Sequence, residues 1–293
     1  MMIKSIVLSS FLFFAFVQSF AQDPKVIGKI LTIYGDQTVR GDHGDQEFAN
    51  SLKEIPEEVT KKPEDLQDAN PTQYKVLPGD RFFAVAGQTI IFHLEDDTEL
   101  VLGPSSLLYF SSWNWVNPET KLRERVVSLI QGSLRVTVKK TYSQKEPFFV
   151  TTPYGALAVR GTEFVVEAGE GGHLLLARYH TKKEVRISRK EMDVHVLSGE
   201  VAFSKTRKGV HLENERVRVL PGQTALIQEK MAMPTLPHPF DLVAFQKYIE
   251  TAFPGVKLAV DQSQTNFLRA QKEGYFEGFF PKERNIASPA EKK

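Results

Sequence analysis

The chain reads FFVTTPYGALAVRGTEFVVE over residues 148–167, a stretch that predicts two β-strands in succession. It spans two runs, 147–152 and 157–166, that are rich in the apolar, branched and aromatic residues that strands favour. Strict alternation of apolar and polar residues marks LRVTV (134–138) before it and VRV (217–219) after it. A period of two is typical of strands with one buried and one solvated face.

Similar short runs recur throughout residues 76–230, separated by turn signals that include LPGD (77–80), Ser198-Gly199 and LPGQ (220–223). Pro-Gly suits a type II turn, because glycine accepts the positive φ that the turn requires. The two Leu-Pro-Gly corners are compatible with duplication or with turn chemistry alone. Many short strands at this spacing predict a mainly β fold: a sandwich, a barrel or a stacked, solenoid-like arrangement.

The chain on either side of this β region has a different character. Acidic residues and Pro56, Pro63 and Pro71 are typical of a polar insertion that buries little. Apolar residues at helical spacing follow Asp241 and predict a short C-terminal helix. We therefore divide the chain into 1–21 (signal peptide), 22–35 (first strand), 36–75 (acidic polar insertion), 76–230 (β domain), 231–260 (helical segment) and 261–293 (tail with a disordered end).

The first 21 residues have the three parts of a secretory signal peptide. Lys4 supplies a positive charge, residues 6–17 (IVLSSFLFFAFV) are apolar, and Ser19-Phe20-Ala21 ends the segment with a small-x-small pattern. The apolar run is shorter than the roughly 18 residues of a membrane span, which makes an uncleaved anchor the weaker alternative. The sequence therefore predicts a periplasmic or secreted protein with no transmembrane anchor after cleavage.

Composition excludes several classes of function. The formal net charge is +1, and removal of residues 1–21 with Lys4 brings it to zero, so no overall basic field attracts nucleic acid. Hydrophobic residues make up 41% and charged residues 25%, which is ordinary for a globular protein. The absence of cysteine excludes both a disulfide framework and a cysteine nucleophile.

No catalytic, cofactor or metal site is predicted from sequence motifs. The seven histidines are scattered, without an H-E-x-x-H motif or a pair at helical spacing. His93 and His195 fall inside predicted strands, where we expect half-exposed side chains. Trp113-Asn114-Trp115, in a predicted loop, is the candidate glycan contact, because Trp113 and Trp115 could stack on sugar rings; packing against the core is the alternative.

Several segments of the β region together resemble the FecR family. They are IIFHLEDDTELVLGPSSLL (90–108), VSLIQGSLRVTV (127–138), the stretch 148–167, DVHVLSGEVAFS (193–204) and VRVLPGQTALI (217–227). The resemblance covers about residues 75–230. The matching residues are Pro153, Val159, Arg160, Gly161, Thr162, Phe164, Gly199 and Gly222.

We expect a structural role for these motif residues. Gly161 lies between larger residues and suits a sharp bend or a β-bulge. Arg160 could place its guanidinium on backbone carbonyls or on a carboxylate such as Glu163, and a ligand contact is the alternative.

The resemblance implies a periplasmic β module. In the iron-sensing members this module follows a cytoplasmic sigma-factor-regulating segment and a transmembrane helix, and here the hydrophobic segment lies at the extreme N-terminus. The first hypothesis is therefore a non-enzymatic envelope module that binds or scaffolds an envelope protein or glycan. A sensor of the iron-siderophore signalling type is the alternative, and a hydrolase acting on wall polysaccharide is the third.

Export is directly testable. If residues 1–21 are a cleaved signal peptide, the protein purified from its native envelope begins at or near Gln22, because signal peptidase cuts after the small-x-small pattern. Intact-mass measurement checks the new N-terminus. A species that retains Met1 in the inner membrane would contradict the prediction.

Overall fold

The computed structural model shows a mainly β protein, as the sequence predicts, and its described residues include one short helix. It describes residues 25–43, 74–116, 121, 123–139, 147–170, 190–207, 210–211, 216–240 and 242–256. The predicted signal peptide, most of the predicted acidic insertion and the predicted tail lie outside these residues. Within the described part, no helix combines the length and the apolar character needed to cross a membrane.

The strands of the described part join into a single 15-stranded sheet. They are β1 (Gly28–Tyr34), β2 (Gly41–His43), β3 (Lys75–Val76), β4 (Asp80–Ala84), β5 (Thr89–Leu94), β6 (Glu99–Leu102), β7 (Ser106–Val116), β8 (Arg123–Thr137), β9 (Phe148–Thr151), β10 (Gly155–Glu170), β11 (Lys190–Arg207), β12 (Val210–His211), β13 (Val217–Val219), β14 (Gln223–Gln228) and β15 (His238–Pro239). Neighbours pair antiparallel, apart from the parallel pair β8–β9.

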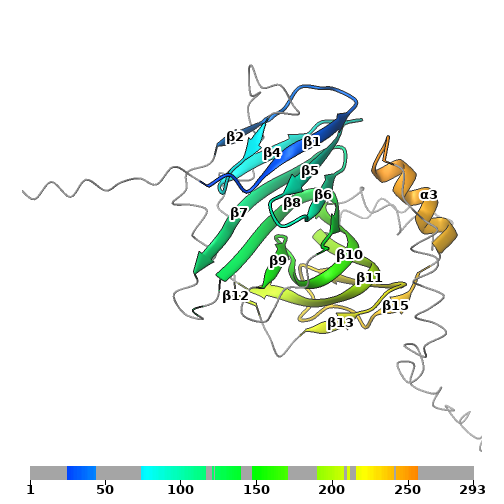
Figure 1. Cartoon of the computed structure of the whole chain (residues 1–293). Coiled ribbons are helices and arrows are strands. Elements are labelled where there is room, and N and C mark those ends of the chain that lie inside the picture. The colour runs from blue at the N-terminus through cyan, green and yellow to red at the C-terminus, as the bar shows by residue number, and fades with distance from the viewer. Residues whose placement is uncertain are drawn as a thin grey trace, which may run out of the picture.

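Four long strands, β7, β8, β10 and β11, form the body of the sheet (Figure 1). Several of the short runs expected from the sequence are thus parts of one continuous strand. Strand β10 lies between β9 and β11 over residues 156–159 and between β8 and β11 over residues 163–168. It is therefore an interior strand of the sheet.

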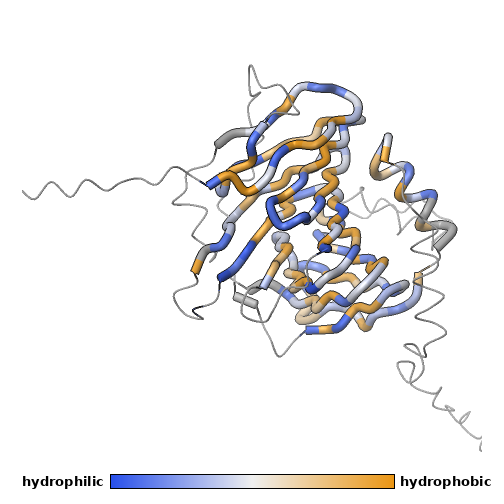
Figure 2. Tube along the Cα trace, in the orientation of Figure 1, coloured by the Kyte–Doolittle hydropathy of each residue, from blue (hydrophilic) through white to orange (hydrophobic). Residues whose placement is uncertain are grey.

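Alternating residues of the long strands build the main core. In β11, Met192, Val194 and Val196 are fully buried on one side, together with Phe164 and Val166 of β10. Apolar residues are concentrated along the strands in Figure 2. The two-residue period that predicted strands therefore also identifies the face of each strand that enters this core.

The turns predicted at the two Leu-Pro-Gly corners are confirmed. In each, the fourth residue donates its N–H to the carbonyl of the first, Asp80 to Leu77 at 3.2 Å and Gln223 to Leu220 at 3.0 Å. The side chains of Asp80 and Gln223 accept the N–H of the same leucines, at 2.9 and 3.0 Å. A third corner, Val85 to Gln88, has both of these hydrogen bonds without a proline. Turn chemistry accounts for the similarity of the corners.

A bulge bends the β10–β11 ladder where glycines of the two strands meet. The register shifts after Arg160, and Gly161 has φ +59°, which confirms the predicted bulge. The turn predicted at Ser198-Gly199 is wrong, because both residues lie within β11. Gly199 has φ +74°, and a Cβ there would lie 2.4 Å from the carbonyl oxygen of Gly161. Only glycine allows this backbone approach.

The predicted C-terminal helix is α3 (Leu242–Ala252). Of the predicted apolar face of Leu242, Phe245, Ile249 and Ala252, the last three are buried against a second core. The side chain of Leu242 lies outside the described part. This core is made by residues on the opposite side of the sheet from the main core, among them Val101 and Val165. Helix α3 therefore covers one face of the sheet (Figure 1).

The described ends of the predicted acidic insertion belong to the sheet. Val39 is buried, β2 pairs with β4, and β3 pairs with β1. The insertion that the sequence places at 36–75 is thus shorter, because residues 36–43 and 74–75 pack against or pair with the strands. Residues 44–73 lie outside the described part.

The close approach at Gly199 generates a stability prediction. Gly199→Ala should lower the free energy of unfolding by about 2–4 kcal/mol, because it adds a backbone clash to the strain of a positive φ. Gly87→Ala is the matched control, since Gly87 has φ +77° with no atom near its absent side chain. The control should lose about 1 kcal/mol. Urea unfolding measures both, and equal losses would contradict the clash.

Candidate functional site

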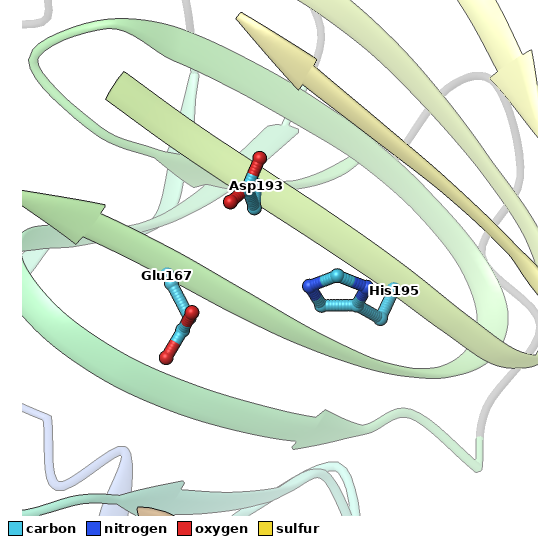
Figure 3. Close-up of side chains that lie close together, drawn as sticks. All are labelled: Glu167, Asp193 and His195. Atoms are coloured by element: carbon cyan, nitrogen blue, oxygen red, sulfur yellow. The ribbon is translucent and has the colours of Figure 1, made fainter. Parts of the chain in front are cut away.

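Three ionisable side chains gather on the face of the sheet that α3 covers. Glu167 lies on β10, directly opposite Asp193 of β11 in the strand register. His195 follows Asp193 by two residues and therefore lies on the same face of β11. Figure 3 shows the three side chains arranged around one space between the two strands. Their carboxylate oxygens and an imidazole nitrogen all lie within 4.8 Å of one another.

These groups are buried although their chemistry favours water. The exposed fractions are 1% for Glu167, 9% for Asp193 and 2% for His195. The half-exposed position predicted for His195 is therefore wrong, whereas that of His93 is confirmed by a side-chain exposure of 34%. Burying ionisable groups without full hydrogen bonding is unfavourable, so such a cluster needs a specific physical explanation.

Helix α3 and β8 each contribute a hydrogen bond to the cluster. The Tyr248 hydroxyl of α3 donates to Oε1 of Glu167, and the Ser133 hydroxyl of β8 donates to the same oxygen at 3.1 Å. Aromatic rings surround the imidazole of His195, with Phe240 and Phe245 at centroid distances of 5.8 and 5.3 Å. The cluster is therefore enclosed between the sheet and an aromatic cover.

Some polar atoms of the cluster remain without a partner among the described residues. They are Oε2 of Glu167 and both ring nitrogens of His195. Glu167 thus has one oxygen held by two donors and a second oxygen that is buried and free. An unsatisfied buried donor or acceptor typically costs about 1–3 kcal/mol, so these three atoms together lower the stability of the fold.

Burial shifts the pKa of each group towards its neutral form. Desolvation raises the pKa of Glu167 to about 7, with the carboxylate of Glu191 adding to the rise and Tyr248 and Ser133 opposing it. Desolvation also raises the pKa of Asp193 well above its ordinary value, helped by Glu167 and Glu191. Desolvation lowers the pKa of His195 to about 3, and His238 adds to this effect. Burial therefore favours the neutral form of each of the three groups.

Two carboxyl groups and an imidazole are a donor set for a divalent cation. The enclosure by α3 makes the cluster a poor catalytic centre, because a substrate would have to displace the aromatic cover. The sequence reasoning missed the group. The available signal was the alternation M-D-V-H-V of residues 192–196 in β11, which places Asp193 and His195 on one face.

The tryptophans predicted as a glycan contact lie in strand β7 and not in a loop. Trp113 is 7% exposed, donates its indole N–H to Glu95 at 2.8 Å and packs edge-on against Phe148. The packing alternative describes this residue, since almost no ring surface is free for a sugar. The side chain of Trp115 lies outside the described part, so its glycan contact stays a prediction.

Of the partners considered for Arg160, the carboxylate of Glu163 is paired with a different arginine. Glu163 instead accepts two hydrogen bonds from Arg135 of β8, the neighbouring strand, and the Arg160 side chain is exposed. Arg160 pairs with Glu200 as the last residue before the shift in register.

The other motif residues occupy structural positions or turns. Val159, Thr162 and Phe164 are buried, and the Thr162 hydroxyl donates to the carbonyl of Glu200 at 3.0 Å. Pro153 is exposed in the turn between β9 and β10. Gly222 has the positive φ of its corner.

Comparison with known proteins identifies one matching family and two similar solved structures. The model of the family described as FecR protein matches residues 81–202. No curated protein matches the sequence significantly. Two crystal structures of a candidate anti-sigma factor from Parabacteroides distasonis ATCC 8503 are similar at 18% identity, with TM-scores of 0.37 and 0.39.

These matches are partial. The two structural alignments cover 55% and 58% of this chain, and they span 60% and 63% of the neighbour's length. The family match begins in β4 and ends in β11, so it contains Glu167, Asp193 and His195, whereas α3 lies beyond it. Residues 81–202 of this chain therefore form a domain of the FecR family.

Proposed function

We propose that this protein is an envelope regulator of the FecR type, an exported and non-catalytic sensor module that relays a signal by binding a protein partner. The observation that carries the proposal is the family match over β4 to β11, the body of the sheet. The signal-peptide pattern of residues 1–21 supports export to the compartment in which such a sensor works.

The enclosure of the ionisable cluster supports binding over catalysis. A general acid or base must reach the proton that it transfers, at hydrogen-bond distance from the substrate. Glu167 and His195 are 1% and 2% exposed, and the rings of Phe240 and Phe245 pack over the imidazole. This arrangement suits a structural or ligand-holding role better than the hydrolase hypothesis.

A scaffold, like a regulator, would bind a partner, but the binding would have a different effect on the cell. Exposed apolar side chains offer possible contact points for a partner in both cases, with Leu236 76% exposed and Val116 49% exposed. A regulator changes gene expression when its partner or signal changes, whereas a scaffold changes only the assembly of the envelope. Transcription therefore separates the two hypotheses.

The test is deletion of the gene in its native host, followed by restoration with the full chain or with a chain lacking residues 1–21. We expect a defined set of transcripts to change on deletion and to return only with the full chain, because the sensor must be exported. RNA sequencing measures both steps. Unchanged transcripts under envelope stress and under iron limitation would contradict the regulatory role.

Photo-crosslinking in the same strains identifies the partner contact. A photoreactive residue at Leu31, Val116 or Leu236 places the probe on three exposed parts of the surface. A regulator should crosslink to a defined membrane protein, and loss of that protein should reproduce the transcript changes. A crosslinked partner whose loss leaves transcription unchanged would favour scaffolding.

A further inference from the structure

The atoms of the buried cluster that have no hydrogen-bond partner are arranged like the ligand atoms of a metal site. Tyr248 and Ser133 both donate to Oε1 of Glu167, which orients the carboxylate and leaves Oε2 unused. Outer hydrogen bonds of this kind orient ligands in known metal sites. His195 lacks a partner at either nitrogen among the described residues, and its ring lies beside the two carboxyl groups (Figure 3).

We infer that Glu167, Asp193 and His195 form a buried site for one divalent metal ion, either zinc or a neighbouring first-row transition metal. The site goes beyond the regulatory role and does not depend on it. It combines ligands from the FecR domain with a cover, α3, from outside the matched region.

The distances between the three ligand atoms allow a metal ion to bind after small movements of the side chains. Three atoms at the 4.8 Å limit have a common centre about 2.8 Å from each, and zinc–ligand bonds measure roughly 2.0–2.2 Å. Each ligand atom therefore needs to move by less than about 1 Å, which side-chain rotation supplies. A water molecule could complete a four-coordinate site.

Charge balance supports the same assignment. Two carboxylates and one neutral imidazole carry a charge of −2, which a divalent ion cancels in the low-dielectric space beneath α3. A cation also satisfies the free oxygen of Glu167 and one nitrogen of His195, the atoms that the described residues leave unpaired.

The donor types select the class of ion. Imidazole nitrogen favours zinc, copper, iron or nickel over magnesium and calcium. Calcium takes six to eight oxygen ligands, and magnesium keeps an octahedral shell that includes several waters. A small site with two carboxylates and a histidine therefore suits zinc and its close neighbours.

The test uses protein purified from cells that express and export the full chain, stripped of metal with EDTA. Isothermal titration calorimetry should show one Zn²⁺ bound per chain, with Mg²⁺ binding far more weakly. Asp193→Asn and His195→Ala should each weaken Zn²⁺ binding by more than about 100-fold, because each removes a direct ligand.

Two control variants separate this site from surface binding and from general damage. His93→Ala removes the exposed histidine beside Asp97 and should leave Zn²⁺ binding unchanged. Tyr248→Phe removes a positioning hydroxyl but no ligand, so it should keep the stoichiometry and weaken binding by about 10-fold. Circular dichroism checks that each variant is folded.

Cobalt provides a readout that does not depend on variants. Co²⁺ added to the stripped wild-type protein should give visible absorption bands of a low-coordinate nitrogen and oxygen site. The proposal is overturned if folded wild-type protein binds no Zn²⁺ and shows only the spectrum of aqueous Co²⁺. It is equally overturned if folded Asp193→Asn and His195→Ala bind Zn²⁺ with wild-type affinity.

Discussion

The register between β10 and β11 is the constraint on which the rest of the structure depends. Pairing of Glu167 with Asp193 places both carboxyl groups on the face covered by α3, while Val166 and Val194 enter the main core. A slip by one residue would exchange these faces and bury charge among apolar side chains. Two compensating register shifts on either side of Glu163, next to the bulge at Gly161, precede this pairing.

Helix α3 converts one face of the sheet from a solvated surface into a second core. Phe245, Ile249 and Phe253 pack against Val101 and Val165, and apolar burial of this kind is the main favourable term in folding. The same packing removes the ionisable cluster from water, which is unfavourable. Tyr248 joins the two effects, because it belongs to the apolar cover and also donates a hydrogen bond to Glu167.

The cluster and α3 are in direct contact, because Glu167 accepts the hydrogen bond of the Tyr248 hydroxyl and Phe245 packs beside the ring of His195. The helix lies outside the region that matches the FecR family, while the ionisable residues lie inside it. The combination is a feature of the whole chain and not of the matched domain alone.

The sequence by itself determined the strands, the corner turns, the Gly161 bulge and the helical spacing of Phe245, Ile249 and Ala252. These features are local, since backbone sterics and periodicity act over a few residues. Burial of His195 and Trp113 depended on elements distant in the chain. Alternation in β11 indicates one solvated face, and only the packing of α3 covers that face. Tertiary structure therefore decided the site, because the register and the cover that assemble it join residues far apart in sequence.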